Sequence, residues 1–335
     1  MAEPITISIV VSNYNYGRFL PQCLDALRAQ TYPHVECIVV DDGSTDDSRT
    51  IIARYPEFQG IFKANAGQAK ALETGFRASR GDVVLFLDAD DYLFPEACAE
   101  IARQWVPGLV SLHYRLQILE GDRLTDRTWP QDHFRDGAET IDCLFRLGYV
   151  PAAPTSGNAY ARAYAAVIFD EVAALPIRWL DSCFAYAAPC AGVTRSTEQA
   201  LGVYRIHDAN LTGWTRRQTI GYVRKSLFTS FQAQRIARRL AARRNIPLPR
   251  WEFLNGPYDL KLHLLTRGGP AFPNDLPPHR ALACASQSAR GFLRMPGVPR
   301  LRRLANVALV FGFAVSPFKL RRAIAERFYN VDFAH

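Results

Sequence analysis

Long hydrophobic runs are missing from this sequence of 335 residues. The nearest candidate, residues 305–315, is shorter than the roughly 18 residues that a membrane-spanning helix needs. The first eight residues have no basic segment followed by an apolar one, so we expect no secretory signal. The seven cysteines are scattered and have no CxxC spacing, which argues against a disulfide framework and a zinc site. These absences favour a cytoplasmic protein with reduced thiols.

Glycine-rich phosphate-binding loops are also missing. No GxGxxG follows the first strand-like run, and GxxxxGK[ST] occurs nowhere in the chain. Proteins that bind phosphate groups directly use such loops, because their backbone amides and a lysine contact the phosphate oxygens. The sequence therefore argues against a dinucleotide-dependent dehydrogenase and against a P-loop nucleoside triphosphatase (NTPase).

Acidic residues are scarce in the last third of the chain. Residues 216–335 contain 22 Lys and Arg against five Asp and Glu, a net charge of +17. Residues 1–215 contain 18 against 27, a net of −9. This asymmetry predicts two regions, 1–215 and 216–335, of which the second meets an anionic surface, either membrane or nucleic acid.

The first hundred residues alternate between strand and helix patterns. Apolar runs predict strands at residues 5–11, 35–40, 61–63 and 83–87. Helical spacing lies between them, at residues 20–27, around Ile51 and at 66–79. Further strands are predicted at 109–119 and 200–206, and helices at 141–147, 181–190 and 220–240. The order predicts an α/β fold with a mostly parallel central sheet and helices on both faces, followed by a helical C-terminal extension.

Two of the predicted strands end in carboxylates. Asp41 and Asp42 follow the second strand, and Asp88, Asp90 and Asp91 follow the strand at 83–87. Carboxylates this close repel one another unless a cation lies between them, and their oxygens suit Mg²⁺ or Mn²⁺. Open α/β sheets bind ligands at the carboxyl ends of their strands. We expect an acidic crevice that holds a nucleotide diphosphate through a divalent cation. A haloacid-type phosphatase is the less favoured alternative, because Tyr92 stands where its nucleophile motif has Thr or Val.

An ordered set of motifs resembles family 2 glycosyltransferases, which have the GT-A fold. The segments that carry the resemblance are residues 9–15 (Ile-Val-Val-Ser-Asn-Tyr-Asn), 39–46 (Val-Val-Asp-Asp-Gly-Ser-Thr-Asp), 65–69 (Asn-Ala-Gly-Gln-Ala), 87–91 (Leu-Asp-Ala-Asp-Asp), 180–181 (Leu-Asp) and 204–210 (Tyr-Arg-Ile-His-Asp-Ala-Asn). They cover roughly residues 5 to 212 in the order of the family. The resemblance implies an inverting transferase that moves one sugar from a nucleotide-diphospho-sugar, with a UDP-sugar favoured.

The resemblance assigns donor contacts to the first half of the chain. Tyr14 would stack on the base, and Asp41 or Asp42 would accept hydrogen bonds from the base or the sugar. Lys70 would reach the charge of the donor. Asp88 would contact the ribose or the metal.

The resemblance also assigns a metal site and a base. Asp90 of the Asp-x-Asp motif would bind Mn²⁺ or Mg²⁺, with Asp88 and His207 as further ligands. Asp181 would be the base that accepts the proton of the acceptor hydroxyl. The family commonly has Glu before this aspartate, whereas this chain has Leu180, so Asp170, Glu171 and Asp208 remain alternatives. The loop at Gly157 and Asn158 would shape the acceptor pocket.

Other members of the family suggest what the chain does not do. Processive synthases have Gln-x-x-Arg-Trp and membrane spans, whereas here Leu175 replaces the glutamine before Arg178 and Trp179. A single transfer, in bacterial surface polysaccharide or lipid-linked glycan assembly, is therefore expected, with a saccharide or lipid-linked acceptor. A degenerate fold that only binds a nucleotide-sugar or glycan is the alternative. A sugar-1-phosphate nucleotidyltransferase would need a glycine- and arginine-rich first loop, which residues 12–18 do not supply.

The basic C-terminal region has its own two interpretations. Leu320, Ile324 and Phe328 lie on one face of a predicted helix, while Lys319, Arg321 and Arg322 lie elsewhere on it. Such a helix can lie on an anionic membrane surface, peripheral to the inner face of the cytoplasmic membrane. It can equally pack on the catalytic domain. No nucleic-acid partner is expected, because no RNA- or DNA-binding module is recognisable.

Overall fold

The computed structural model describes residues 3–131, 134, 136–147, 150, 153–177, 179–207, 218–247, 261, 263–265, 280–294, 299–328 and 331–332. Contacts between residues divide the chain into two compact units. The first comprises Met1–Gly137 and Pro151–Leu211, and the second comprises Ala138–Val150 and Thr212–His335. Residues 138–150 group with the second unit although they precede the predicted boundary at 215. The catalytic role predicted for residues 1–215 and the association with an anionic surface predicted for residues 216–335 stay predictions.

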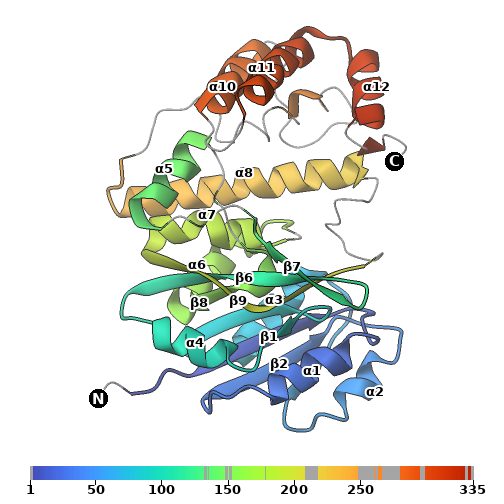
Figure 1. Ribbon diagram of the computed structural model, residues 1–335, viewed down its shortest axis with the longest axis vertical. Helices are drawn as coiled ribbons and strands as arrows, with labels where there is room; N and C mark the ends of the chain where they lie inside the picture. The colour runs from blue at the N-terminus through green and yellow to red at the C-terminus, as the bar shows by residue number, and fades with distance from the viewer. Residues whose placement is uncertain are drawn as a thin grey trace. The chain divides into compact units, whose positions relative to one another are not determined.

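A nine-stranded sheet runs through the described part of the first unit (Figure 1). Its strand order is β3-β2-β1-β4-β8-β6-β9-β5, and β7 pairs with β6. The strands are β1 (Ile7–Asn13), β2 (Val35–Asp41), β3 (Gln59–Phe62), β4 (Val83–Asp88), β5 (Tyr92–Leu93), β6 (Leu109–Glu120), β7 (Arg123–Trp129), β8 (Asn158–Ala161) and β9 (Val193–Ile206).

The first four strands pair in parallel, as their apolar runs predict. β1 lies between β2 and β4, and β2 also pairs with β3. All seven residues of β1 are buried, because helices cover both faces of the sheet. Ile9 packs in the core that contains Leu24 of α1, whereas Val10 on the opposite face approaches Gly75 of α3. The helices of this unit are α1 (Leu20–Arg28), α2 (Ser48–Ile52), α3 (Gln68–Ala78), α4 (Ala97–Gln104), α6 (Arg162–Val172) and α7 (Asp181–Ala191).

The rest of the sheet is mixed. β6 and β9 pair in parallel, whereas β5, β7 and β8 each pair antiparallel with their neighbours. β8 lies between β4 and β6 and follows the 3-10 turn η1 (Thr155–Gly157). This insertion places η1 next to the end of β4, where the acidic triplet begins.

The described part of the second unit is mainly helical. It contains α5 (Gly137–Leu147), α8 (Ile220–Arg243), α10 (Ala281–Arg294), α11 (Arg300–Val315) and α12 (Phe318–Phe328), with the short parallel strands β10 (Gln218–Thr219) and β11 (Val331–Asp332). Thr219 caps α8, since its Oγ1 accepts a hydrogen bond from the backbone N–H of Tyr222. Val223, Phe292 and Phe313 belong to a separate hydrophobic core.

The predicted apolar face of α12 is divided in the structure. Leu320 is exposed, whereas Ile324 packs against the core of the second unit. The side chain of Phe328 lies outside the described residues. Within the described part of the chain, no helix combines the length and apolarity that crossing a membrane requires.

Candidate active site

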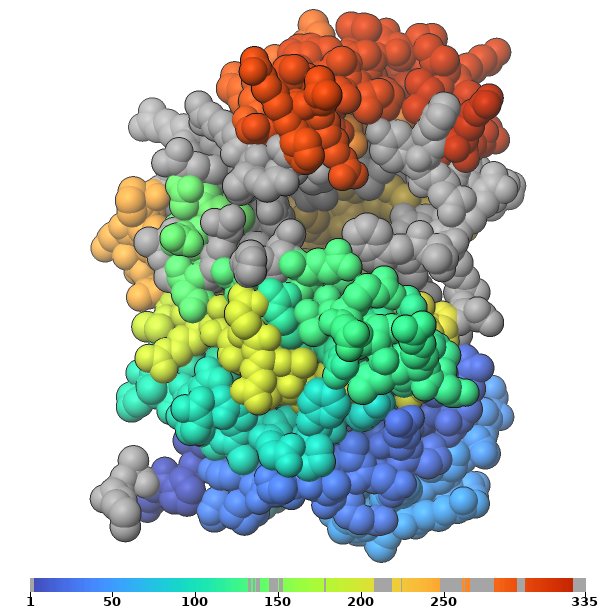
Figure 2. Space-filling model, viewed as in Figure 1, coloured from blue at the N-terminus to red at the C-terminus, as the bar shows by residue number. Residues whose placement is uncertain are grey.

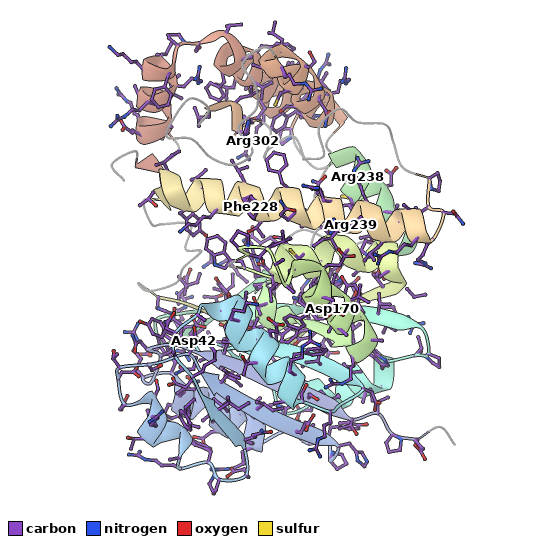
Figure 3. The ribbon with its side chains drawn as sticks, turned by 180° about the vertical axis from the view of Figure 1, so that it is seen from behind. Asp42, Asp170, Phe228, Arg238, Arg239 and Arg302 are labelled. Atoms are coloured by element: carbon purple, nitrogen blue, oxygen red, sulfur yellow. The ribbon has the colours of Figure 1, made fainter. Side chains whose placement is uncertain are left out.

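The carboxyl ends of β1, β2 and β4 bring the predicted donor-binding residues together. Asn13 is paired in register with Asp41, and Ser12 with Asp88. These strands are adjacent and parallel, so polar side chains that lie far apart in the sequence meet at one edge of the sheet. Asp42, labelled in Figure 3, directly follows Asp41 at this edge.

Asp88, Asp90 and Asp91 form a compact acidic cluster. Each offers one carboxylate oxygen, and these oxygens all lie within 4.8 Å of one another. Burial and the neighbouring charge of Asp90 raise the pKa of Asp88 to about 7. Burial and the charges of Asp90 and Asp88 raise the pKa of Asp91 well above its usual value. A divalent cation would relieve the repulsion that causes part of these shifts.

Asp91, to which the sequence assigned no role, connects the cluster to the scaffold. Its Oδ2 accepts a hydrogen bond from the Ser156 hydroxyl at 2.6 Å, and its Oδ1 accepts one from the backbone N–H of Arg205 at 3.0 Å. Ser156 also accepts a hydrogen bond from the backbone N–H of Asp88 at 3.2 Å. Asp91 therefore ties η1 and β9 to the end of β4. Only the unusual third carboxylate hinted at this role.

His207 lies against Asp90, as the predicted metal site requires. The distance from His207 Nε2 to Asp90 Oδ2 is 2.9 Å, and Arg18 Nη2 lies 3.4 Å from His207 Nδ1. The imidazole ring also contacts the rings of Phe19 and Tyr16. These neighbours orient the imidazole, so that one ring nitrogen points at the acidic cluster.

Arg205 fixes the end of β9, the strand that directly precedes His207. Its Nε donates to the backbone carbonyl of Asp90 at 2.9 Å, and its Nη2 donates to Gln22 Oε1 at 2.5 Å. The guanidinium also lies 4.8 Å from the centre of the Phe19 ring. The sequence motif contained Arg205, but its local pattern did not reveal these contacts with residues more than a hundred positions away.

Asp41 and Asp42 are both buried and engaged with the protein. Asp41 Oδ1 accepts hydrogen bonds from Asn13 Nδ2 at 2.8 Å and from the Ser44 hydroxyl at 2.5 Å. Asp42 accepts from Lys63 Nζ at 2.5 Å and from the backbone N–H groups of Ala66 and Gly67. These contacts fix the loops around the predicted nucleotide site, including the turn before α3. Direct contact of either carboxylate with the base or sugar stays a prediction.

Tyr14 and Lys70 are both exposed. Tyr14 is 48% exposed in the loop after β1, so its ring is accessible to a base. Lys70 forms an ion pair with Glu73 at 2.9 Å on the surface of α3. Gln68, in the first turn of the same helix, instead contacts the acidic cluster, since its Nε2 donates to Asp88 Oδ1 at 2.6 Å. Gln68 was part of a recognised motif but was not assigned to the site.

Asp181 is the first residue of α7, and its side chain accepts a hydrogen bond from the backbone N–H of Ser182 at 2.7 Å. Burial raises the pKa of Asp181. The charge of Asp181 in turn contributes to the raised pKa of Asp88. Among the alternative bases, Asp170 forms an exposed ion pair with Arg77, Glu171 is the next residue of α6, and Asp208 lies outside the described residues.

Gly157 and Asn158 are part of a buried network at the start of β8. Asn158 Oδ1 lies 2.6 Å from His113 Nδ1, and Asn158 Nδ2 donates to the backbone carbonyl of Pro154 at 2.6 Å. A Cβ at Gly157 would lie 2.3 Å from the Cβ of Ala153, so only glycine fits there. The network fixes the turn that carries Ser156. Contact of this loop with an acceptor stays a prediction.

Comparison with known proteins shows the family to which the chain is similar. A model described as glycosyl transferase family 2 matches residues 8–131. An uncharacterized glycosyltransferase of Nostoc sp., alr2836, is 36% identical over 213 residues, which cover 61% of this chain and 66% of that protein. The putative glycosyltransferase EpsH of Bacillus subtilis is 34% identical over 105 residues, which cover 30% of each protein. The chain thus covers less than two thirds of the length of these relatives.

A solved structure extends the similarity to the fold. The crystal structure of S. aureus TarS 1-349 in complex with UDP-GlcNAc has a TM-score of 0.52 and 14% identity, and covers 96% of this chain and 92% of that chain. The α/β fold is therefore of the GT-A type, as expected. The chain belongs to glycosyltransferase family 2.

Proposed function

We propose that the protein transfers a single sugar from a nucleotide-diphospho-sugar to an acceptor hydroxyl, with inversion at the anomeric carbon. The acidic cluster at the end of β4, with His207 lying against Asp90, is the observation that carries this proposal. A UDP-sugar is the favoured donor, which agrees with the UDP-GlcNAc bound to the fold relative TarS. A saccharide or lipid-linked acceptor, at the inner face of the cytoplasmic membrane, fits the predicted pathway.

The side chains of the candidate metal site have the ligand atoms that a divalent cation prefers. Among the described residues, Gln68 and Ser12 donate to Asp88 Oδ1, which leaves Oδ2 for a ligand. Both oxygens of Asp91 are already hydrogen-bonded, so we assign the metal to Asp88, Asp90 and His207. Carboxylate oxygens with one imidazole suit Mn²⁺ or Mg²⁺. When bound, the cation supplies positive charge next to the diphosphate that leaves.

The remaining steps fall to the side chains of the chain itself. Tyr14 would stack on the base of the donor, and Asp41 and Asp42 hold the loops that surround it. Asp181 would accept the proton of the acceptor hydroxyl. At the same time the hydroxyl oxygen would bond to the anomeric carbon, and the bond from that carbon to the diphosphate would break. Burial raises the pKa of Asp181, which makes its carboxylate a stronger base than an exposed aspartate.

A panel of UDP-, GDP- and dTDP-sugars tests the donor and the metal. We expect one nucleotide to raise the unfolding temperature only with Mn²⁺ or Mg²⁺, and to be slowly hydrolysed. Asp90→Asn should abolish both effects, whereas Asp122→Asn, an exposed residue in the turn after β6, should leave them intact. Stabilisation without turnover would favour a binding protein, and a metal response that survives Asp90→Asn would contradict the metal assignment.

The base is tested separately. Asp181→Asn should lower the rate of transfer at least about a hundredfold while donor-dependent stabilisation remains, because the base acts on the acceptor. Asp170→Asn is the matched comparison, since Asp170 lies in an exposed ion pair on α6. A loss of transfer in Asp170→Asn but not in Asp181→Asn would exchange the two roles.

A further inference from the structure

The outward face of α11 is an apolar stripe without polar side chains. Its members recur every three or four residues along the helix, and they are Leu301, Leu304, Ala305, Ala308, Phe311, Gly312 and Val315. Leu301 is 82% exposed and Val315 is 72% exposed. In Figure 2 atoms of residues 280–294 and 299–328, coloured orange to red, are visible at the surface of the second unit. We call these seven residues the α11 stripe.

The α11 stripe is not the face that stabilises the unit. The opposite side of α11 contributes Val310 and Phe313 to the core, where Phe292 of α10 and Ala325 of α12 also lie. The helix is therefore apolar both toward the core and toward the solvent. The outward face stays in water and so gains nothing from folding, and an exposed apolar face of this kind is typical of an interaction surface.

The part of the sequence that contains the stripe is basic. Residues 280–328 contain ten Lys and Arg against one acid, Glu326, a net charge of +9. Arg300 is exposed at the first position of α11 and Lys319 at the second position of α12, and neither forms an ion pair with a described residue. The first turn of α11 contains Arg300, Arg302 and Arg303 and no acid, although the positive end of the helix dipole disfavours cations there. An anionic surface would offset this repulsion.

We propose that the α11 stripe inserts into the interface of an anionic lipid bilayer, with Arg300 and Lys319 contacting phosphate headgroups. The helix has 16 residues and lies flat in the interface, because it is too short to cross the hydrocarbon region. A second copy of the chain fits the stripe less well, since it would bring two segments of net charge +9 together. This proposal goes beyond sugar transfer and does not depend on it.

Flotation of the full-length protein with vesicles tests the proposal. Binding is expected to vesicles of phosphatidylcholine and phosphatidylglycerol at low salt, and not to vesicles of phosphatidylcholine alone. Leu301→Ser combined with Val315→Ser should weaken binding at least about tenfold, because both exposed side chains lose their contact with lipid. Leu124→Ser is the matched control, since Leu124 is 44% exposed on β7 of the first unit.

The charges are tested by a second pair of variants. Arg300→Gln with Lys319→Gln should weaken binding to anionic vesicles and reduce its dependence on salt, whereas Arg103→Gln, at an exposed position of α4, should not. Equal binding by the serine double variant and the wild type would overturn the proposal. The proposal would also be overturned if the wild type did not bind anionic vesicles but formed a dimer, and the serine double variant were a monomer. That result would assign the stripe to an interface with a second copy of the chain.

Discussion

The protonation of Asp88 depends on carboxylates that approach it from two directions. Asp90 is two positions away in the sequence, whereas Asp181 comes from the start of α7, and both raise the pKa of Asp88 together with burial. In the unfolded chain the group has an ordinary pKa of about 4. The folded protein therefore binds this proton more tightly than the unfolded chain does. The stabilisation of the folded state by protonation of Asp88 is complete below about pH 4 and is lost as the pH rises to about 7.

Without a divalent cation, we accordingly expect the protein to unfold at a lower temperature at pH 8 than at pH 5. Asp88→Asn should reduce this difference and stabilise the protein at pH 8 by about 2 kcal/mol, because it removes one charge from the repelling cluster. Thermal unfolding in the presence of a chelator measures both effects. An unfolding temperature of Asp88→Asn with the same pH dependence as the wild type would refute this explanation.

The hydroxyl of Ser156 links two members of the acidic cluster, and Ser156 is 1% exposed. Ser156→Ala leaves Asp91 Oδ2 without its donor, so the free energy of unfolding should fall by about 1–3 kcal/mol. Thr194→Val is the control, because the Thr194 hydroxyl is also buried but has no hydrogen-bond partner among the described residues. Urea unfolding should show no loss of stability in this control. Equal losses in both variants would mean that the Ser156 hydrogen bonds contribute nothing.

At the scale of the element, the close approach of α3 to the sheet fixes the position of Gln68 beside Asp88. Gly75 permits this approach, since a Cβ there would lie 2.3 Å from Val10 Cγ1 and 3.0 Å from Val40 Cγ2. Gly75→Ala should therefore destabilise the protein by about 1–3 kcal/mol through overpacking. Gly312→Ala in α11 meets no atom within 4 Å and should stabilise by about 0.5–1 kcal/mol. Denaturant titration of both variants should give opposite signs, and a shared sign would contradict the packing argument.

The elements that the sequence predicted well are those with a strong local pattern. The apolar run at 83–87 became β4, and the helical spacing at 220–240 became α8, because burial on both faces or on one stripe leaves a clear periodicity. β5 and β8 were not predicted. They are two and four residues long, and their place is decided by pairing with β9, β4 and β6.

Some candidate site residues could also be picked out from local motifs, and their roles stay predictions. Asp88, Asp90 and His207 stood in recognisable motifs, and the structure brings His207 and Asp90 together. The hydrogen bonds of Asp91 with Ser156 and Arg205 join residues 65 and 114 positions apart, so no local pattern contains them. The partners of Asp42 in the turn before α3 are likewise set by the packing of the loops.

At the scale of the whole molecule, each of the two units has its own hydrophobic core. Phe292, fully buried in the second core, does not belong to the core that contains Ile9 and Leu85 of the first. Phe292→Ala should destabilise the second unit by about 3–5 kcal/mol through the cavity that it leaves. Hydrogen exchange should then become faster in α8, α10 and α11, while the amides of β1 and β4 keep their protection. Equal loss of protection in β1 and β4 would show that the two units unfold as one.

The hydrogen bonds of Asp91 and Asp90 with Arg205 and His207 also constrain how the chain is made. The acidic cluster leaves the ribosome more than a hundred residues before the arginine and the histidine that complete its surroundings. Contacts at such separations form late, because a long loop must close first. A nascent chain that ends before residue 205 therefore carries three mutually repelling carboxylates that β9 does not yet hold in place. The acidic cluster of the first unit, which ends at Leu211, therefore reaches its folded surroundings only when synthesis of that unit is nearly complete.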